Sequence, residues 1–172
     1  KDKKLLKDIS KYNNIQMAQK ISLNSAYGAI GNAYFRYHNH LIAEGITTSG
    51  QLSIKWIESD INRYLNEVME TSDEDYVIAS DTDSVYVVLD RYVSQKFKSE
   101  PDTTTIINEL DRFAKEDIEP IIDKSYQNLA SYLNCHSQRM NMKREVIADK
   151  GIWTAKKRYI LNAYDVEGVR YK

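Results

Sequence analysis

The sequence predicts an α+β fold, and three of its patterns carry this prediction. Long segments near the N-terminus and in the middle place apolar residues at helical spacing. Two short β-branched runs flank an acidic turn, as in a β-hairpin. Roughly the last forty residues alternate between apolar and polar side chains, which is typical of half-buried strands. We therefore expect an antiparallel sheet backed by helices.

The first two predicted helices differ in their apolar content. From about residue 3 to 31 the apolar positions follow a helical period but are sparse, which predicts a long polar helix projecting as an arm. A second helix is expected from about 44 to 69, where apolar residues are frequent enough for a core helix. Trp56 on this helix and Trp153 near the C-terminus are interpreted as core or interface anchors.

The remaining elements should build the sheet and its support. The third helix has several candidate N-cap residues between Asp102 and Thr105, and Pro120 is a candidate kink within it. The alternating C-terminal segment should add strands to the same antiparallel sheet as the hairpin. The predicted elements are strands at 76–79 and 85–89 and a helix from about 102 to 133.

Charge is distributed unevenly along the 172 residues, although the formal net charge is only −1. Six lysines and two aspartates in the first twenty residues make one end basic, and six basic and two acidic residues between 143 and 158 do the same near the other. The stretch between them is acidic. This arrangement suits a polyanion held at two edges, and ordinary solvated faces are the alternative.

Two absences in the sequence set the expected environment. No apolar run approaches the roughly 18 residues that span a bilayer, and no apolar segment follows the lysine-rich N-terminus, so we expect neither export nor a membrane partner. The single Cys135 cannot form an internal disulfide, and no Cys/His set has zinc-ligand spacing. A reducing, cytoplasmic compartment is therefore expected.

Asp81 and Asp83 lie close together in the predicted hairpin turn. Neighbouring carboxylates raise each other's pKa unless a cation lies between them. Mg²⁺ fits such a site because it takes a few hard oxygen ligands and keeps several waters. The alternative is an Asx-turn, in which the aspartates simply bond to their own backbone.

Lys20, Asn24, Tyr27 and Gly28 share one face of the first predicted helix, because offsets of 4, 7 and 8 residues return to the same side. A lysine can hold a triphosphate as a point charge, and the amide can hydrogen-bond beside it. The ring and the bare glycine backbone can form a platform for a base pair. The alternative is a solvent-facing lysine followed by an ordinary helix end.

Lys156, Lys157, Arg158 and Tyr159 are predicted to begin a strand. Alternation would send Lys157 and Tyr159 to one face, and Lys156 and Arg158 to the other. The first face could present an ammonium and a phenol to a duplex groove, while the second contacts phosphate or solvent. A solvated edge strand guarded by lysines is the alternative.

Together, these three motifs resemble those of the family B DNA polymerases. Their order is K-x-x-x-N-S-x-Y-G on a helix, D-T-D-S in a hairpin turn and K-K-R-Y on a later strand. Residues 24–32, 46–51 and 156–159 are most similar to the replicative polymerases of T-even-like bacteriophages. The resemblance covers nearly the whole chain. It implies that residues 1–31 are the C-terminal helix of the fingers and that residues 32–172 are a palm, with an antiparallel sheet backed by helices.

The resemblance also implies a reaction and the acids that serve it. The reaction is two-metal nucleotidyl transfer of a dNTP to a primer 3′ end in DNA replication. Asp83 would be a direct catalytic ligand of Mg²⁺, with Asp81 as its neighbouring acid. Glu145, on a strand entering the sheet, is expected to be an accessory acid near the metals.

Further roles are implied for the helix face and for the basic motif. Lys20 would hold the incoming triphosphate, with Asn24 beside it, while Tyr27 and Gly28 would line the pocket for the nascent base pair. Contacts in the minor groove reach acceptors common to all base pairs, so they check pairing geometry rather than sequence. The expected contacts with this groove at the primer end are Lys157 and Tyr159, with Lys156 and Arg158 as further DNA-binding residues.

Parts of the family's site have no counterpart in this sequence. The D-x-x-S-L-Y-P-S motif with the first metal-binding aspartate does not occur, and the first fingers helix, the exonuclease domain and the thumb are missing. The segment before Lys157 is also shorter and poorer in glycine than expected for the phage group. The expected partners are primer–template DNA, a dNTP, an N-terminal polymerase polypeptide carrying the missing aspartate, the thumb domain and a sliding clamp.

Three interpretations of the chain remain open. It is one polypeptide of a split polymerase, or an inactive fragment of such an enzyme, or a phosphohydrolase or non-catalytic nucleotide- or DNA-binding module that reuses the palm. In the first two interpretations, the chain alone should have little or no polymerase activity. Two metals need more than one direct aspartate ligand, and Asp83 is the one expected in this chain. If phage-encoded, it should work in the host bacterial cytoplasm.

Overall fold

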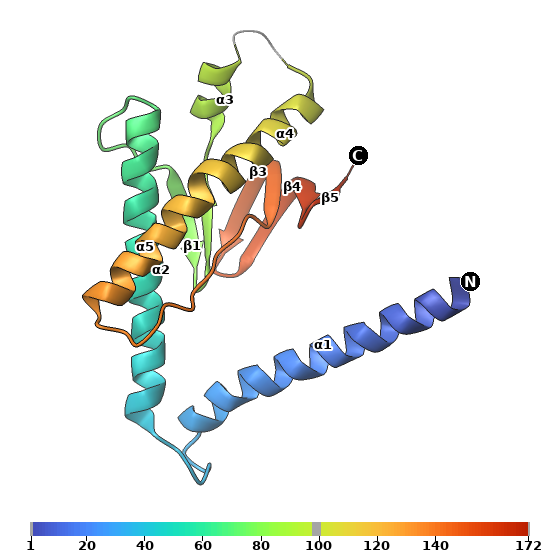
Figure 1. The fold of residues 1–172 in the computed structure, drawn as a ribbon, viewed down its shortest axis with the longest axis vertical. Coiled ribbons are helices and arrows are strands. Elements are labelled where there is room, and N and C mark those ends of the chain that lie inside the picture. The colour runs from blue at the N-terminus through green and yellow to red at the C-terminus, as the bar shows by residue number, and fades with distance from the viewer. Residues whose placement is uncertain (1, 98–100, 172) are drawn as a thin grey trace. The chain divides into compact units, whose positions relative to one another are not determined.

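The computed structural model describes residues 2–97 and 101–171 (Figure 1). The chain divides into two compact units, Lys1–Ser49 and Gly50–Lys172. No helix in the described ranges is long and apolar enough to cross a membrane. The elements are α1 (Asp2–Gly31), α2 (His40–Val68), β1 (Val77–Asp81), β2 (Ser84–Val87), α3 (Asp90–Lys96), α4 (Thr103–Phe113), the π-helical η1 (Ala114–Ile118), α5 (Glu119–Tyr132), β3 (Val146–Ala155), β4 (Arg158–Val166) and β5 (Val169–Arg170).

Helix α1 makes up most of the first unit and buries none of its side chains. This agrees with its sparse apolar positions, and the helix predicted over 3–31 is confirmed. The carbonyl of Ile30, near the helix end, accepts a hydrogen bond from Asn39 N at 3.0 Å and lies 2.9 Å from His38 Nδ1. Asn39 then caps α2, because its Oδ1 accepts from Ile42 N at 3.1 Å.

The second unit has a hydrophobic core against the inner face of α2. Ile57, Ile61 and Leu65 recur every four residues and are at most 1% exposed, so they form one stripe on the helix. The core helix predicted over 44–69 is confirmed, and it begins a few residues earlier. The core cluster consists of Ile57, Ile61, Leu65, Met69, Tyr76, Val77, Tyr92, Phe113, Ile118, Ile122 and Tyr126.

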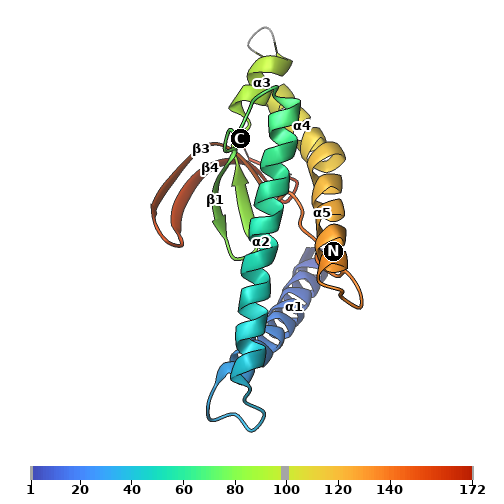
Figure 2. The same cartoon turned by 90° about the vertical axis from the view of Figure 1, so that its left-hand side faces the viewer.

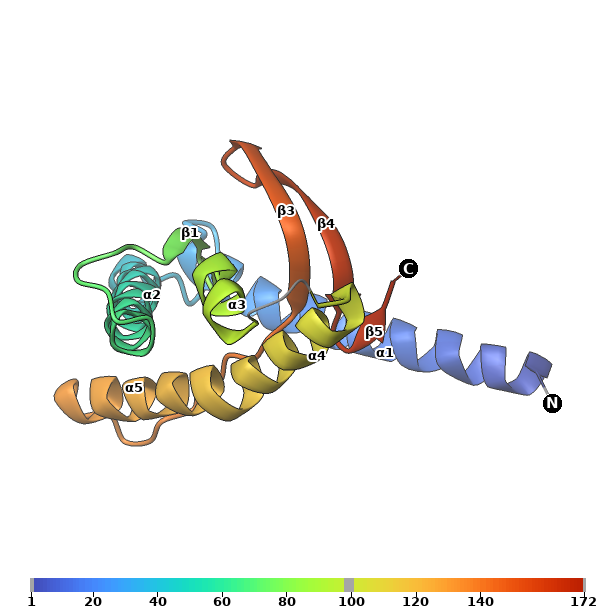
Figure 3. The same cartoon turned by 90° about the horizontal axis from the view of Figure 1, so that it is seen from above.

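Helices α4 and α5 follow one another through η1 along one side of the second unit (Figure 3). Of the candidate N-caps between Asp102 and Thr105, Asp102 caps α4, because its side chain accepts from Thr105 N at 3.3 Å. Pro120 lies in the first turn of α5. Because Pro120 has no N–H to donate to Glu116, the turn before it widens into a π-helix, and the predicted helix over 102–133 continues past the proline.

The strands form two sheets, so the α+β class is confirmed but the expected single sheet is not found. β1 and β2 pair antiparallel, with Asp81 opposite Ser84, and β3, β4 and β5 form a separate antiparallel sheet. Within the described residues, no strand pairing joins the two sheets. Alternation of side chains identifies the two faces of a strand but not the edge that pairs, which is why the sequence could not separate the sheets.

The long β3–β4 hairpin curves beside the short β1–β2 hairpin in the second unit (Figures 2 and 3). Its two ends have different surroundings. The base lies next to α4, and the far end turns through Lys156 and Lys157. The turn at the base joins β4 to β5 through Glu167 and Gly168, which both have positive φ, at 52° and 86°. Glycine suits the second of these positions because it has no Cβ.

Candidate active site

The acidic turn joins β1 to β2 through Thr82 and Asp83. The carbonyl of Asp81 accepts from Asp83 N at 2.6 Å and from Ser84 Oγ at 3.2 Å. Thr82 has a φ of 56°, which is unusual for a β-branched residue, and its hydroxyl donates to Asp81 Oδ1 at 3.0 Å. In the described residues neither carboxylate accepts a backbone N–H, so this turn is not the Asx-turn of the alternative interpretation.

A hollow of about 480 Å³ opens beside this turn. The acidic turn contributes one side, and Glu145 and the far end of the β3–β4 hairpin contribute the other. The structure therefore brings together Asp81, Asp83, Glu145, Lys157 and Tyr159, all of which the sequence indicated as site residues. The lining residues are Asp81, Thr82, Asp83, Ser84, Tyr86, Glu145, Lys157 and Tyr159.

The basic motif begins in a turn rather than on a strand. Lys156 and Lys157 connect Ala155 to Arg158, which face each other across the hairpin, and Lys157 has a φ of 61°. The predicted alternation therefore does not set the directions of the two lysines, because the turn geometry does. Lys157 and Tyr159 still line the same hollow, while Lys156 and Arg158 do not.

Three aromatic rings connect the two hairpins at the hollow. The ring centroid of Tyr86, on β2, lies 5.3 Å from that of Trp153 and 5.4 Å from that of Tyr159, both edge to face. Such pairs add to the stabilisation from buried area. Burial and the Tyr159 hydroxyl raise the pKa of Tyr86. Trp153 is 38% exposed, so it is not a core residue, and its contact with Tyr86 leaves the predicted interface role. Tyr86 was not predicted, although alternation from Ser84 places it on the face next to the site.

The carboxylate of Asp83 also affects a buried tyrosine of the core, Tyr126. Burial, followed by the carboxylates of Asp83 and Asp123, raises the pKa of Tyr126, which is 5% exposed. The exposed acidic turn therefore lies close to the buried ring of Tyr126.

The predicted helix face is present on α1. Because α1 is unbroken from residue 2 to 31, Lys20, Asn24, Tyr27 and Gly28 share one side of it. Tyr27 is 42% exposed, and no described atom lies within 4 Å of the position that a Cβ would take at Gly28. This face belongs to the first unit and the hollow belongs to the second.

The carboxylates of the turn supply part of a metal coordination shell. No group of three or more His, Cys, Asp or Glu side chains in residues 2–97 and 101–171 could hold a metal ion. Asp81 and Asp83 offer two hard oxygen donors, and Mg²⁺ commonly takes one or two carboxylates together with substrate phosphates and waters. This donor set fits Mg²⁺ when substrate or residues outside the described part of the chain supply the other ligands.

Comparison with known proteins places this chain in a family. The family model of DNA polymerase family B matches residues 1–168. The chain is 44% identical over 165 residues to the DNA-directed DNA polymerase of Escherichia phage RB69, covering 91% of the chain and 18% of that protein. It is 43% identical over 171 residues to the DNA-directed DNA polymerase of Enterobacteria phage T4, covering 92% and 19%. The DNA polymerase of Choristoneura biennis entomopoxvirus is 26% identical over 178 residues, covering 87% and 17%.

The chain thus spans a little under a fifth of the length of these relatives. The match to the family model covers nearly all of the chain, and two phage polymerases share more than two fifths of the aligned residues. As the resemblance of its motifs predicted, the chain belongs to DNA polymerase family B.

Proposed function

We propose that this chain forms part of the polymerising site of a template-directed DNA polymerase, which adds dNTPs to a primer 3′ end in DNA replication. One observation carries the proposal: two carboxylates of the β1–β2 turn share a hollow with a lysine and a tyrosine from a separate hairpin. The carboxylates suit a cation and the lysine suits phosphate, so the hollow pairs the two chemistries that nucleotidyl transfer needs.

Each residue of the hollow has a role in this proposal. Asp83 is the direct ligand of Mg²⁺ and Asp81 the neighbouring acid, with Glu145 as an accessory acid. When bound, Mg²⁺ supplies Lewis acidity toward the phosphate and the primer hydroxyl. Lys157 and Tyr159 contact the minor groove at the primer end and hold the 3′ hydroxyl near the acidic turn. Positioning of this kind accounts for much of the catalysis in phosphoryl transfer.

The α1 face is the proposed nucleotide-binding element. Lys20 and Asn24 hold the triphosphate, and Tyr27 and Gly28 pack against the nascent base pair. The open space around Gly28 supports this role because a base pair could approach the bare backbone. In this proposal residues 1–31 are the C-terminal helix of the fingers and the rest of the chain is palm, although the compact units divide after residue 49.

The polymerase site needs at least one more acid than the turn supplies, because two metals must be held. We propose that an N-terminal polymerase polypeptide or domain provides the missing aspartate. One edge of β2 and one edge of β3 carry no partner strand in the described part of the chain. Unpaired edges accept further strands, so either edge could receive the segment that carries this aspartate.

Other partners follow from the same proposal. The substrates are primer–template DNA and a dNTP, and the thumb domain and a sliding clamp complete the replicating assembly. Lys156 and Arg158 lie next to the hollow in sequence but outside its lining, which suits contacts to phosphates farther along the duplex. Since the two most similar relatives reported above belong to phages, the host bacterial cytoplasm is the proposed location.

Reconstitution tests this function. The chain alone should not extend a primer, and addition of an upstream family B polypeptide that carries the missing aspartate should restore extension. Asp83→Ala should reduce the restored rate by about a thousandfold or more. Asp123→Ala, which removes an exposed carboxylate of α5 outside the hollow, should retain the rate. Extension by the chain alone would contradict the proposal, and nucleotide hydrolysis without template or partner would favour a phosphohydrolase.

A further inference from the structure

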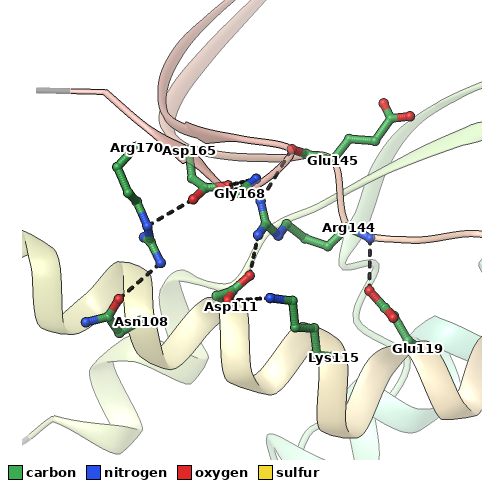
Figure 4. A network of polar contacts seen from close by, with 9 residues as sticks. All are labelled: Asn108, Asp111, Lys115, Glu119, Arg144, Glu145, Asp165, Gly168 and Arg170. Carbon is green, nitrogen blue, oxygen red and sulfur yellow. Dashed lines mark hydrogen bonds and ion pairs between the residues drawn. The ribbon is translucent and has the colours of Figure 1, made fainter. Parts of the chain in front are cut away.

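A buried ion network lies at the base of the β3–β4 hairpin (Figure 4). Its centre is Arg144, whose side chain is 10% exposed, and Asp165 on β4, whose side chain is 1% exposed. Arg144 Nη1 donates to Asp165 Oδ1, and Nη2 donates to Asp111 Oδ1 on α4. One guanidinium therefore joins the hairpin to the helix behind it, as the planar fork of arginine allows.

Further contacts surround the carboxylate of Asp165. Gly168 N donates to Oδ1 at 3.0 Å. Arg170 Nε lies 2.9 Å from Oδ2, close enough for an ion pair but without the alignment of a hydrogen bond. Arg170 Nη2 donates to Asn108 Oδ1, on α4, at 3.0 Å. Arg170 therefore links the Asp165 carboxylate to β5 and to α4. This is the second connection to α4, after the one through Arg144.

Asp165 remains ionised despite its burial. Burial alone would raise its pKa, but the Gly168 N–H and the guanidinium groups of Arg144 and Arg170 together hold this pKa below its ordinary value. In the same way, burial would raise the pKa of Asp111, and Lys115 and Arg144 hold it below the ordinary value. The carboxylates of Asp165 and Asp111 are therefore negatively charged at neutral pH, and each accepts a hydrogen bond from the Arg144 guanidinium.

A network of this kind contributes geometry more than stability. Desolvation of the charges offsets much of their attraction, and apolar residues of similar volume often stabilise a protein equally well. Directional hydrogen bonds to a buried carboxylate nevertheless restrict how the elements that carry the donors can be placed. At this position the elements are α4 and the base of the hairpin that reaches the hollow.

The network also fixes the backbone of Glu145. The Glu145 carbonyl accepts from Glu167 N at 2.7 Å and from Arg144 Nη1 at 3.4 Å. The neighbouring Arg144 N donates to Glu119 Oε1, on α5, at 3.1 Å. The Glu145 carboxylate points away from these contacts (Figure 4) and lines the hollow with the acidic turn.

We propose that Arg144 and Asp165 are positioning residues for the site, and this inference rests on the proposed function. Through them, α4 holds the β3–β4 hairpin so that Glu145 at its base and Lys157 and Tyr159 at its far end meet Asp81 and Asp83. No strand pairing joins the two sheets in the described residues, so side-chain contacts set the alignment: this network, the aromatic contact at Tyr86 and the burial of Ile147 at the base of β3.

A structural measurement on this chain tests the inference without any catalytic activity. Cross-ring NOEs between Tyr86 and Trp153 report the placement of the far end of the hairpin. In Asp165→Asn and Arg144→Lys these NOEs should fall by at least about half, since each variant loses directional bonds that the network needs. NOEs between the stacked rings of Tyr92 and Phe113, whose centroids are 4.0 Å apart, should persist and confirm that the core is folded.

Asp149→Asn is the matched control at an exposed position of β3, and its amide oxygen can still accept from Asn162 Nδ2, as Asp149 Oδ1 does at 2.7 Å, so both sets of NOEs should be unchanged. If Asp165→Asn does not fold, Arg144→Lys decides, because it keeps the cation in the network. Retention of the Tyr86–Trp153 NOEs in a folded Asp165→Asn or Arg144→Lys variant would overturn the proposal.

Kinetics of the reconstituted polymerase provide the functional readout. Arg144→Lys should raise the KM for primer–template by about tenfold while the KM for dNTP stays within about twofold, because a change of angle at the base displaces Lys157 and Tyr159, at the far end of the hairpin, the most. Arg144→Met should be more impaired than Arg144→Lys. A merely structural role would lower the amount of active enzyme, and hence kcat, with both KM values unchanged. If the unmodified assembly shows no extension, the proposed function fails and the NOE experiment alone decides this inference.

Discussion

The two hairpins of the second unit have the same turn length but different support. β1 and β2 have five and four residues, and Val77 on β1 is 4% exposed within the core. β3 and β4 have ten and nine residues, and Ile152 and Ile160 on them are 64% and 71% exposed. The short hairpin is thus part of the core, whereas the long one is an arm held by a few side chains.

This difference matches the tolerance of the proposed chemistry at each turn. A metal ligand must be placed to within a fraction of an ångström, and Asp81 and Asp83 lie on the hairpin that the core supports. Contacts to a DNA groove tolerate more movement, and Lys157 and Tyr159 lie on the arm. We therefore expect changes to the core to lower the stability that supports the acidic turn, and changes to the ion network to alter mainly the placement of the long hairpin.

Truncation of a core residue should have the largest effect on stability. Ile61 is 1% exposed, so Ile61→Ala should remove about 3 to 4 kcal/mol from the free energy of unfolding through lost apolar contact and the remaining cavity. Ile160→Ala on the exposed arm is the matched control and should cost less than about 0.5 kcal/mol. Urea denaturation followed by circular dichroism measures both. Equal losses would show that the arm shares the core's stability.

The sequence predicted the helices and the acidic turn because each depends on local pattern. The stripe of Ile57, Ile61 and Leu65 is a helical period, and Asp102 was one of several candidate N-caps before α4. Asp81 and Asp83 were located in a hairpin turn because β-branched runs surround them. All of these signals lie within a few residues of the structure they specify.

Features that depend on distant contacts were not predicted. Helix α3 has only seven residues, too few for a clear period. The edges at which strands pair are chosen by tertiary packing, so two sheets were not separable from one. The network around Arg144 joins residues 33 and 21 positions away, at Asp111 and Asp165. Lys157 and Tyr159 were predicted to share one face of a strand; both line the hollow, but Lys157 is placed there by the turn before β4 rather than by strand alternation.

Low pH should weaken the ionic contacts of α4 but not the contacts of the apolar core, so the two contributions to stability can be measured apart. Glu109 accepts from Arg112 Nη2 and from the Tyr92 hydroxyl, both at 2.7 Å, and lies 3.4 Å from Lys96 Nζ. The Arg112 hydrogen bonds, followed by those from Tyr92 and Lys96, outweigh burial and lower the pKa of Glu109 from 4.5 to about 2. Because the folded-state pKa is depressed, the stabilisation is complete above pH 4.5 and is lost as the pH falls toward about 2.

Thermal unfolding between pH 7 and pH 2 measures this contribution. The unmodified chain should lose about 2 kcal/mol more than Glu109→Gln over the acidic range, after allowance for the solvent exposure of Arg112. Glu67→Gln, which removes an exposed carboxylate of α2, should follow the unmodified chain. Parallel curves for Glu109→Gln and the unmodified chain would show that Glu109 is not held in its charged form by these partners.

The smallest expected change in the free energy of unfolding comes from backbone strain, which differs between the two hairpin turns. Thr82 has a φ of 56° and is β-branched, while Lys157 has a φ of 61° with an unbranched side chain. Positive φ is costlier for β-branched residues, and asparagine tolerates it, so Thr82→Asn should stabilise the chain by about 0.5 to 1 kcal/mol. Lys157→Asn should gain less stability, because its turn lies on the arm and a lysine carries less strain there.

Urea denaturation of both variants, with Thr104→Asn in α4 as a neutral control, measures the difference. A loss of stability in Thr82→Asn would mean that the threonine hydroxyl on Asp81 Oδ1 stabilises the turn by more than the strain costs.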